Sequence, residues 1–149
     1  MIDRQSLLGF LPETLLIGAA LLVLLIGAFA PHAKRIVFWI SIGALLGFIS
    51  LAFRLFLWNG EPTLFSGAIA LDPFAIFFKI FFGFVTLATI VFSVRAKEFE
   101  GYGLAELSAF LLTLTVGMSM MAASMDLLMM FLSLEMVSVL SYVLVGYKV

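Results

Sequence analysis

The chain has 149 residues, of which 64% are hydrophobic and 11% are charged, and its formal net charge is −1. Soluble domains contain roughly 45–50% apolar and 25% charged residues, so the composition indicates a protein that lies in a lipid bilayer. The sequence has no cysteine and a single histidine, His32, which excludes disulfides and histidine or thiolate metal clusters. The absence of a basic excess argues against nucleic acid as a partner.

Five apolar stretches are long enough to cross a membrane, because a spanning helix needs about 20 mainly apolar residues. Their apolar runs are continuous and do not alternate with period two, which favours helices over the strands of a barrel. The sequence therefore predicts an all-α, polytopic membrane protein with five transmembrane helices in one domain, residues 1–149. The expected spans are residues 12–30, 36–58, 73–94, 104–123 and 126–147.

The first span begins at Pro12, which suits the first turn of a helix because its missing N–H has no partner there. Glu13 stands at the mouth of this apolar run. No convincing small-residue cleavage site follows the run, and further apolar stretches come after it. We expect a retained span and not a cleaved signal peptide.

The basic residues near the span ends predict an orientation, since short cytoplasmic loops are enriched in lysine and arginine. The loop of residues 59–72 has neither, and Arg54 is close enough to the end of span two to reach the interface. The alternation places the N-terminus outside and residue 149 on the cytoplasmic side. The basic residues used are Lys34, Arg35, Arg95, Lys97 and Lys148.

The third span contains Lys79, about two turns inside its outer end and on the same helical face as Gly83 and Thr86. One interpretation makes Lys79 a charge partner for a carboxylate. The interpretation we favour at this stage is snorkelling, in which the stem packs on phenylalanines and the ammonium reaches the headgroups.

The fourth span carries Ser108, Thr115 and Ser119 at helical spacing, with Leu112 between them. Small and hydroxyl residues in this pattern favour close helix packing and interhelical hydrogen bonds. We therefore predict a helix interface, and the alternative is the lining of a water path. Glu106 opens this span, where a helix N-terminus favours negative charge.

The fifth span contains Glu135 near its middle. It follows Asp126, the expected N-cap, by nine residues, which is about 13–14 Å along a helix axis. A central charge costs about 2.5–3.5 kcal/mol, whereas each large aliphatic residue favours insertion by roughly 0.3–0.6 kcal/mol. The helix still inserts, but Glu135 lies too deep to reach water as an end residue would.

A carboxyl at this depth is a candidate proton relay. Burial disfavours its charged form and a nearby lysine favours it, so a group held between these effects can exchange a proton near neutral pH. Ser138 and Tyr142 follow on the same helical face and extend a polar stripe that could orient water. The alternatives are a neutral, hydrogen-bonded packing group, and a sodium ion in place of the proton.

Three stretches resemble the N subunit of bacterial NADH-quinone oxidoreductase (respiratory complex I), one of the antiporter-like membrane subunits. They are ALDPFAIFFKIFF, GMSMMAASMDLLMMFLSLEM and SVLSYVLVGY. In that family the glutamate at the position of Glu135 is an essential member of a proton path. Family members have about fourteen spans in two inverted repeats. The resemblance thus implies that this chain is the first part, an N-terminal third, of such a fold, with the partner lysines of Glu135 in later spans.

The resemblance also implies a function, partners and a location. The expected function is proton translocation coupled to quinone reduction elsewhere in the complex, by a subunit without a redox centre. NADH, FMN, iron–sulfur clusters and quinone are expected in other membrane and peripheral subunits, and the location is the bacterial inner membrane, in contact with its lipids. Two alternatives are a subunit of a multisubunit cation/proton antiporter and a structural membrane scaffold.

Overall fold

The computed structural model describes residues 4–30, 33–57, 63–95 and 103–146. His32, Lys97 and Lys148 lie outside these residues.

Six helices make up most of the described chain. Five of them are long and apolar enough to cross a membrane, which confirms the predicted all-α fold with five spans. Each observed span begins and ends within two residues of its predicted limits. The helices are α1 (Arg4–Gly9), α2 (Leu11–Phe29), α3 (Lys34–Phe56), α4 (Pro73–Arg95), α5 (Leu104–Ala123) and α6 (Leu127–Gly146).

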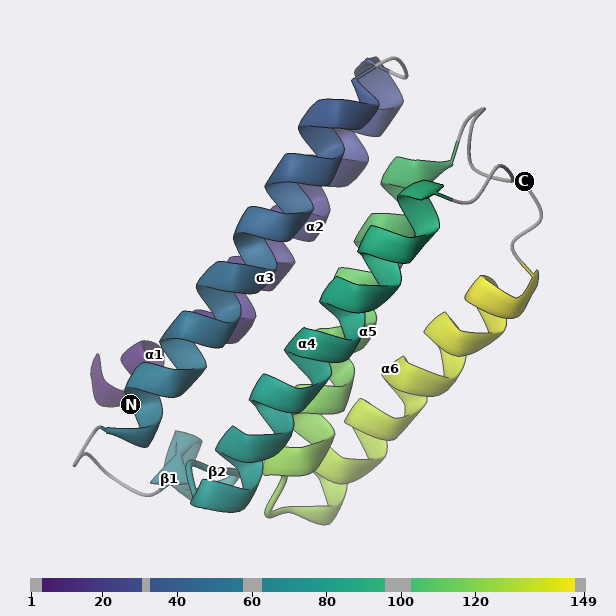
Figure 1. Ribbon diagram of the computed structural model, residues 1–149. Coiled ribbons are helices and arrows are strands. Elements are labelled where there is room, and N and C mark those ends of the chain that lie inside the picture. The colour runs from purple at the N-terminus through teal and green to yellow at the C-terminus, as the bar shows by residue number, and fades with distance from the viewer. Residues whose placement is uncertain (1–3, 31–32, 58–62, 96–102, 147–149) are drawn as a thin grey trace.

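The long helices run side by side along a common direction (Figure 1). Helix α5 packs against α2, α3, α4 and α6, so it lies at the centre of the bundle. Half of the apolar window of α5 is buried, compared with 6% for α6, which lies at the edge and packs chiefly against α5. The main core contains Leu16, Leu45, Phe48, Leu112 and Val116, all fully buried or nearly so.

One end of the bundle carries a small hairpin between the second and third spans. Strands β1 (Thr63–Leu64) and β2 (Ile69–Ala70) pair antiparallel around the 3-10 turn η1 (Phe65–Gly67). Gly67 has φ 94°, a conformation that glycine adopts without steric cost. Hydrophobic residues of the hairpin form a second cluster with Ala75 and Ala123, which covers this end of α4 and α5.

Hydrogen bonds attach the hairpin to the helices around it. The backbone N–H of Phe65 donates to Ser6 Oγ of α1 at 3.3 Å, and that of Met125 donates to the Ala68 carbonyl at 3.0 Å. The hairpin therefore joins α1 to the turn between α5 and α6. We call this end of the bundle the hairpin end.

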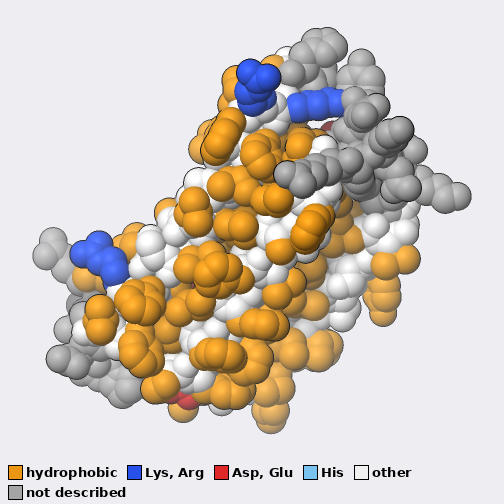
Figure 2. Space-filling model, in the orientation of Figure 1, with side chains coloured by type: hydrophobic (Ala, Val, Ile, Leu, Met, Phe, Trp, Pro, Cys, Tyr) orange, Lys and Arg blue, Asp and Glu red, His pale blue; other side chains and the backbone are white. Residues whose placement is uncertain are grey.

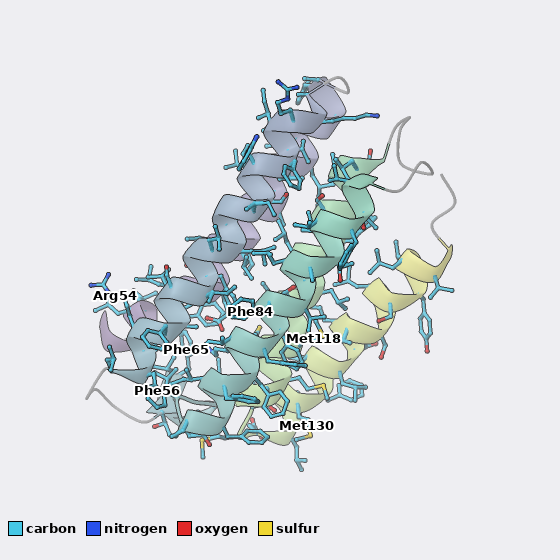
Figure 3. All side chains as sticks on the ribbon, in the orientation of Figure 1. Arg54, Phe56, Phe65, Phe84, Met118 and Met130 are labelled. Atoms are coloured by element: carbon cyan, nitrogen blue, oxygen red, sulfur yellow. The ribbon has the colours of Figure 1, made fainter. Side chains whose placement is uncertain are left out.

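The surface is that of a membrane protein. Hydrophobic side chains cover most of the face seen in Figure 2, and lysine and arginine side chains gather toward the ends of the bundle. Arg54 projects away from the last turn of α3 at the hairpin end (Figure 3). This exposed position agrees with the interfacial location predicted from its place in the span.

Candidate functional site: a buried ion pair and an outward-facing glutamate

Glu13 and Lys79 form an ion pair in the interior of the bundle. Lys79 Nζ lies 2.6 Å from Glu13 Oε1, and each side chain is only 1% exposed. Ser119 Oγ donates a second hydrogen bond to the same carboxylate oxygen, at 2.7 Å. The three residues join α2, α4 and α5 at one point.

The order of the helices explains how residues so far apart in sequence meet. Helices α2 and α4 both begin at the hairpin end, and α5 ends there. Glu13 is the third residue of α2, and Lys79 is the seventh of α4. Asp72 fixes the start of α4, because its Oδ1 accepts a hydrogen bond from the N–H of Ala75 at 2.8 Å.

The snorkelling interpretation of Lys79 is wrong. Its ammonium is buried and paired with Glu13, which lies 66 positions earlier in the chain. A buried carboxylate at the same depth provides the negative charge that lipid headgroups would otherwise provide. The Lys79 side chain therefore stays inside the bundle. Lys79 is thus a charge partner for a carboxylate, the interpretation that we had ranked second.

Glu13 is the site residue that sequence reasoning missed. A signal was present, since Glu13 and Lys79 carry opposite charge and stand near the same predicted side of spans one and three. In the sequence Glu13 is visible only as an acidic residue at the mouth of the first apolar run. Which neighbour a span packs against is a tertiary property that periodicity does not reveal.

The hydroxyl residues of α5 lie at helix interfaces, as predicted. Ser108, Thr115 and Ser119 are at most 1% exposed. Thr115 Oγ1 lies 2.6 Å from Thr86 Oγ1 of α4, a distance that allows either hydroxyl to donate. Thr115 Oγ1 also lies 2.8 Å from the carbonyl of Leu111, one turn earlier in its own helix.

Two buried side-chain atoms of this region have no hydrogen-bond partner among the described residues. They are Glu13 Oε2 and Ser108 Oγ. Buried polar atoms are nearly always paired with protein or water, so each such exception calls for a physical explanation.

Glu135 faces away from the other described helices. It is exposed, and it forms no ion pair or hydrogen bond within the part of the chain that the structure describes. The opposite face of α6 packs on α5, where a Cβ added to Gly117 would lie 3.0 Å from Val137 Cγ2. Glu135 is the ninth of the twenty residues of α6, which confirms its expected place in the middle of the span.

Ser138 and Tyr142 share the outward face with Glu135 by their helical spacing. Ser138 Oγ donates to the carbonyl of Leu134 in its own helix, at 2.8 Å. The Tyr142 side chain is 75% exposed. The structure does not bring either hydroxyl into a hydrogen bond with Glu135, and their supporting roles stay predictions.

These features define a class of protein. Five apolar helices, three of which share a buried ion pair, define a polytopic membrane protein.

Comparison with known proteins identifies the family. The chain is 41% identical over 144 residues to NADH-quinone oxidoreductase subunit N 2 of Chloroherpeton thalassium, covering 93% of this chain and 28% of the relative. It is 34% identical to subunit N of an Anaeromyxobacter species, over 98% of this chain and 28% of the relative. It is 38% identical to NAD(P)H-quinone oxidoreductase subunit 2 of a Picosynechococcus species, over 93% of this chain and 26% of the relative.

The chain belongs to the family of NADH-quinone oxidoreductase N subunits, and it spans little more than a quarter of the length of these relatives. No protein-family model matches it. These relatives are named as subunits of NADH-quinone oxidoreductase, and the N-subunit resemblance read from the sequence motifs is confirmed.

Proposed function

We propose that this chain is part of a proton-translocating, antiporter-like subunit of NADH-quinone oxidoreductase, and that Glu135 is its proton relay. The observation that carries the proposal is the position of Glu135. It is a carboxylate in the middle of a spanning helix, on the face that the described bundle leaves uncovered, within a chain similar to N subunits.

The uncovered face of α6 supports this role. Ionisable residues in spanning helices almost always face protein or a water-filled cavity, because a charge in contact with lipid is costly. The relatives are more than three times as long as this chain, so they have further residues to cover that face. We propose that later helices of the full subunit cover Glu135 and supply a lysine partner.

In this proposal the chain takes no part in redox chemistry. Oxidation of NADH and reduction of quinone occur in other subunits, which hold FMN and iron–sulfur clusters. Glu135 accepts a proton from one side of the membrane and releases it toward the other when the charge of its partner changes. The membrane is the bacterial inner membrane, with the N-terminus outside and residue 149 on the cytoplasmic side.

The experiment compares Glu135→Gln with wild type in the assembled complex, reconstituted in vesicles. Glutamine keeps the shape of the side chain but cannot exchange a proton, so we expect proton pumping to fall by about tenfold or more, the scale of a lost proton-transfer group. Glu106→Gln is the matched control, because it makes the same change in the first turn of α5, away from the middle of a span. The proposal is refuted if Glu135→Gln pumps as many protons per NADH oxidised as wild type.

The same preparation separates a proton from a sodium relay. Replacing sodium by choline in both compartments leaves the pumping rate unchanged if Glu135 carries protons. A pumping rate that falls when sodium is removed would favour the cation/proton antiporter alternative.

A further inference from the structure

A second set of polar groups crosses the interior of the bundle, and Glu135 is not among them. Ser108, Thr115 and Ser119 repeat along one face of α5, at intervals of seven and four residues. A helix rises 1.5 Å per residue, so Ser108 and Ser119 are separated by about 16–17 Å along the axis. Each of the three hydroxyls is buried.

Side chains from neighbouring helices join this row. The Glu13–Lys79 pair meets it at Ser119, and Thr86 meets it at Thr115. We call these six residues the polar column: Glu13, Lys79, Thr86, Ser108, Thr115 and Ser119.

The two ends of the column hold the two unpartnered atoms. Glu13 Oε2 lies at the hairpin end and Ser108 Oγ at the other, and these are the two buried side-chain oxygens without a hydrogen-bond partner in the described chain. Both side chains are 1% exposed. Polar atoms buried without a protein partner are the usual positions of internal water, which binds where it can satisfy such groups.

We propose that the polar column is a second proton-transfer path in the membrane, with internal water bound at Glu13 Oε2 and Ser108 Oγ and bridging the intervals of about 6 Å and 10–11 Å along α5 between Ser119, Thr115 and Ser108. The inference rests on the proposed function, since it assumes that the subunit moves protons. It assigns spans one, three and four (α2, α4 and α5) a part in that movement, in addition to the role of Glu135 on the fifth.

The groups of the column have the chemistry that a proton path requires. A hydroxyl accepts one proton and gives up another, so a row of hydroxyls and waters passes a proton along without moving its heavy atoms. Either hydroxyl of Thr86 and Thr115 can donate the hydrogen bond between them. The bond can therefore return to its starting direction after each proton transfer. At the hairpin end, Glu13 Oε2 can accept a proton while Oε1 stays bonded to Lys79 and Ser119.

The ammonium of Lys79 decides which ion the column carries. It already lies 2.6 Å from the carboxylate, at the position that a sodium ion would need. A second cation there would be repelled by the fixed positive charge, since like charges close together interact unfavourably, and more strongly in a protein interior than in water. A proton needs no separate site, because it binds to Oε2 itself.

The test removes the two hydroxyls in the middle of the column without changing the shape of their side chains. The variant is Thr86→Val with Thr115→Val in the full-length subunit, within the assembled complex in vesicles. The matched control is Thr89→Val with Thr113→Val, on the same two helices. In the control pair each hydroxyl bonds only to a carbonyl of its own helix, off the column. The measurement is the number of protons pumped per NADH oxidised.

We expect the column variant to lower the ratio of protons to NADH by about twofold or more, and the control to keep the wild-type ratio. An unchanged ratio in the column variant overturns the proposal. If that variant does not assemble, Ser108→Ala takes its place, because it breaks no hydrogen bond to the described protein. A wild-type ratio with Ser108→Ala also overturns the proposal.

Glu135→Gln is measured in parallel so that the two proposals can fail separately. If Glu135→Gln loses proton pumping and the column variant keeps it, the proposed path through the polar column is refuted and the relay role of Glu135 is not. Normal pumping in Glu135→Gln with a lowered ratio in the column variant refutes the relay role of Glu135 and leaves the column supported.

Discussion

The Glu13–Lys79 pair predicts an unusual pattern of stability. Removing either charge should destabilise the bundle far more than removing both. Lys79→Met leaves the carboxylate of Glu13, which is 1% exposed, with one neutral hydrogen-bond donor, Ser119. Glu13→Gln leaves the ammonium of Lys79, which is equally buried, without a countercharge.

The magnitude follows from burial. Taking one partner away from a buried ion pair costs about 3–5 kcal/mol, because the remaining charge is uncompensated. At 1.4 kcal/mol per tenfold change, the unfolding equilibrium shifts by roughly two to three and a half orders of magnitude. The double variant holds no unpaired charge, and the side-chain oxygen at position 13 can still accept the hydrogen bond from Ser119. Replacing both members of a buried ion pair by uncharged side chains often changes the stability little. We expect it to be about 2–4 kcal/mol more stable than either single variant.

The assay is detergent-induced unfolding of the purified full-length subunit in mixed micelles, followed for wild type, both single variants and the double variant. The coupling free energy is the departure from additivity in this cycle. Arg54→Met is the control, since it removes an exposed basic side chain at the same end of the bundle and should have little effect. If the two single effects simply add in the double variant, the reasoning about the pair is wrong.

Three further outcomes follow from the packing. Gly27→Ala places a Cβ in contact with Ala105 Cβ and should destabilise by about 1–3 kcal/mol, and Ala105→Gly should restore stability; unfolding of the double variant checks this. Asp72→Ala removes the bond to the first turn of α4 and should cost about 0.5–2 kcal/mol in the same assay, whereas an unchanged midpoint would show that the cap is dispensable. A spin label at Val139→Cys, on the face of Glu135, should be shielded from lipid-dissolved oxygen in the full-length subunit. A label at Phe92→Cys, on the exposed face of α4, should not, and equal accessibility at the two positions would count against a covered Glu135.

The spans could be predicted because they depend on local information. A run of about 20 apolar residues must cross the membrane as a helix, whatever its neighbours, since hydrocarbon leaves the backbone no other hydrogen-bond partners. The place of Glu135 in the middle of α6 follows from the same counting. The hairpin at residues 63–70 was missed because its strands are only two residues long and are held by bonds to Ser6 and Met125, far away in sequence.

The ion pair could not be predicted by the same means. Snorkelling and pairing of Lys79 are both consistent with its depth, and the choice depends on whether a carboxylate lies opposite. That carboxylate is on α2, which contacts α3 and α5 as well, so adjacency in the sequence does not reveal it. The interface stripe of α5 was predictable because small and hydroxyl residues suit any close helix contact, but its role in orienting Glu13 was not.

Glu13 and Glu135 differ in whether the described helices supply their partners. Glu13 has its countercharge and a hydroxyl donor within α4 and α5, so this part of the protein holds its buried charge without help from later helices. Glu135 has neither among the described residues, although it lies near the middle of its span. A helix that places a carboxylate on its uncovered face is stable in a membrane only if that face meets protein or water. Among the described residues, α6 is thus the helix that leaves a carboxylate-bearing face uncovered, and the relay proposed for Glu135 needs protein or water on that face.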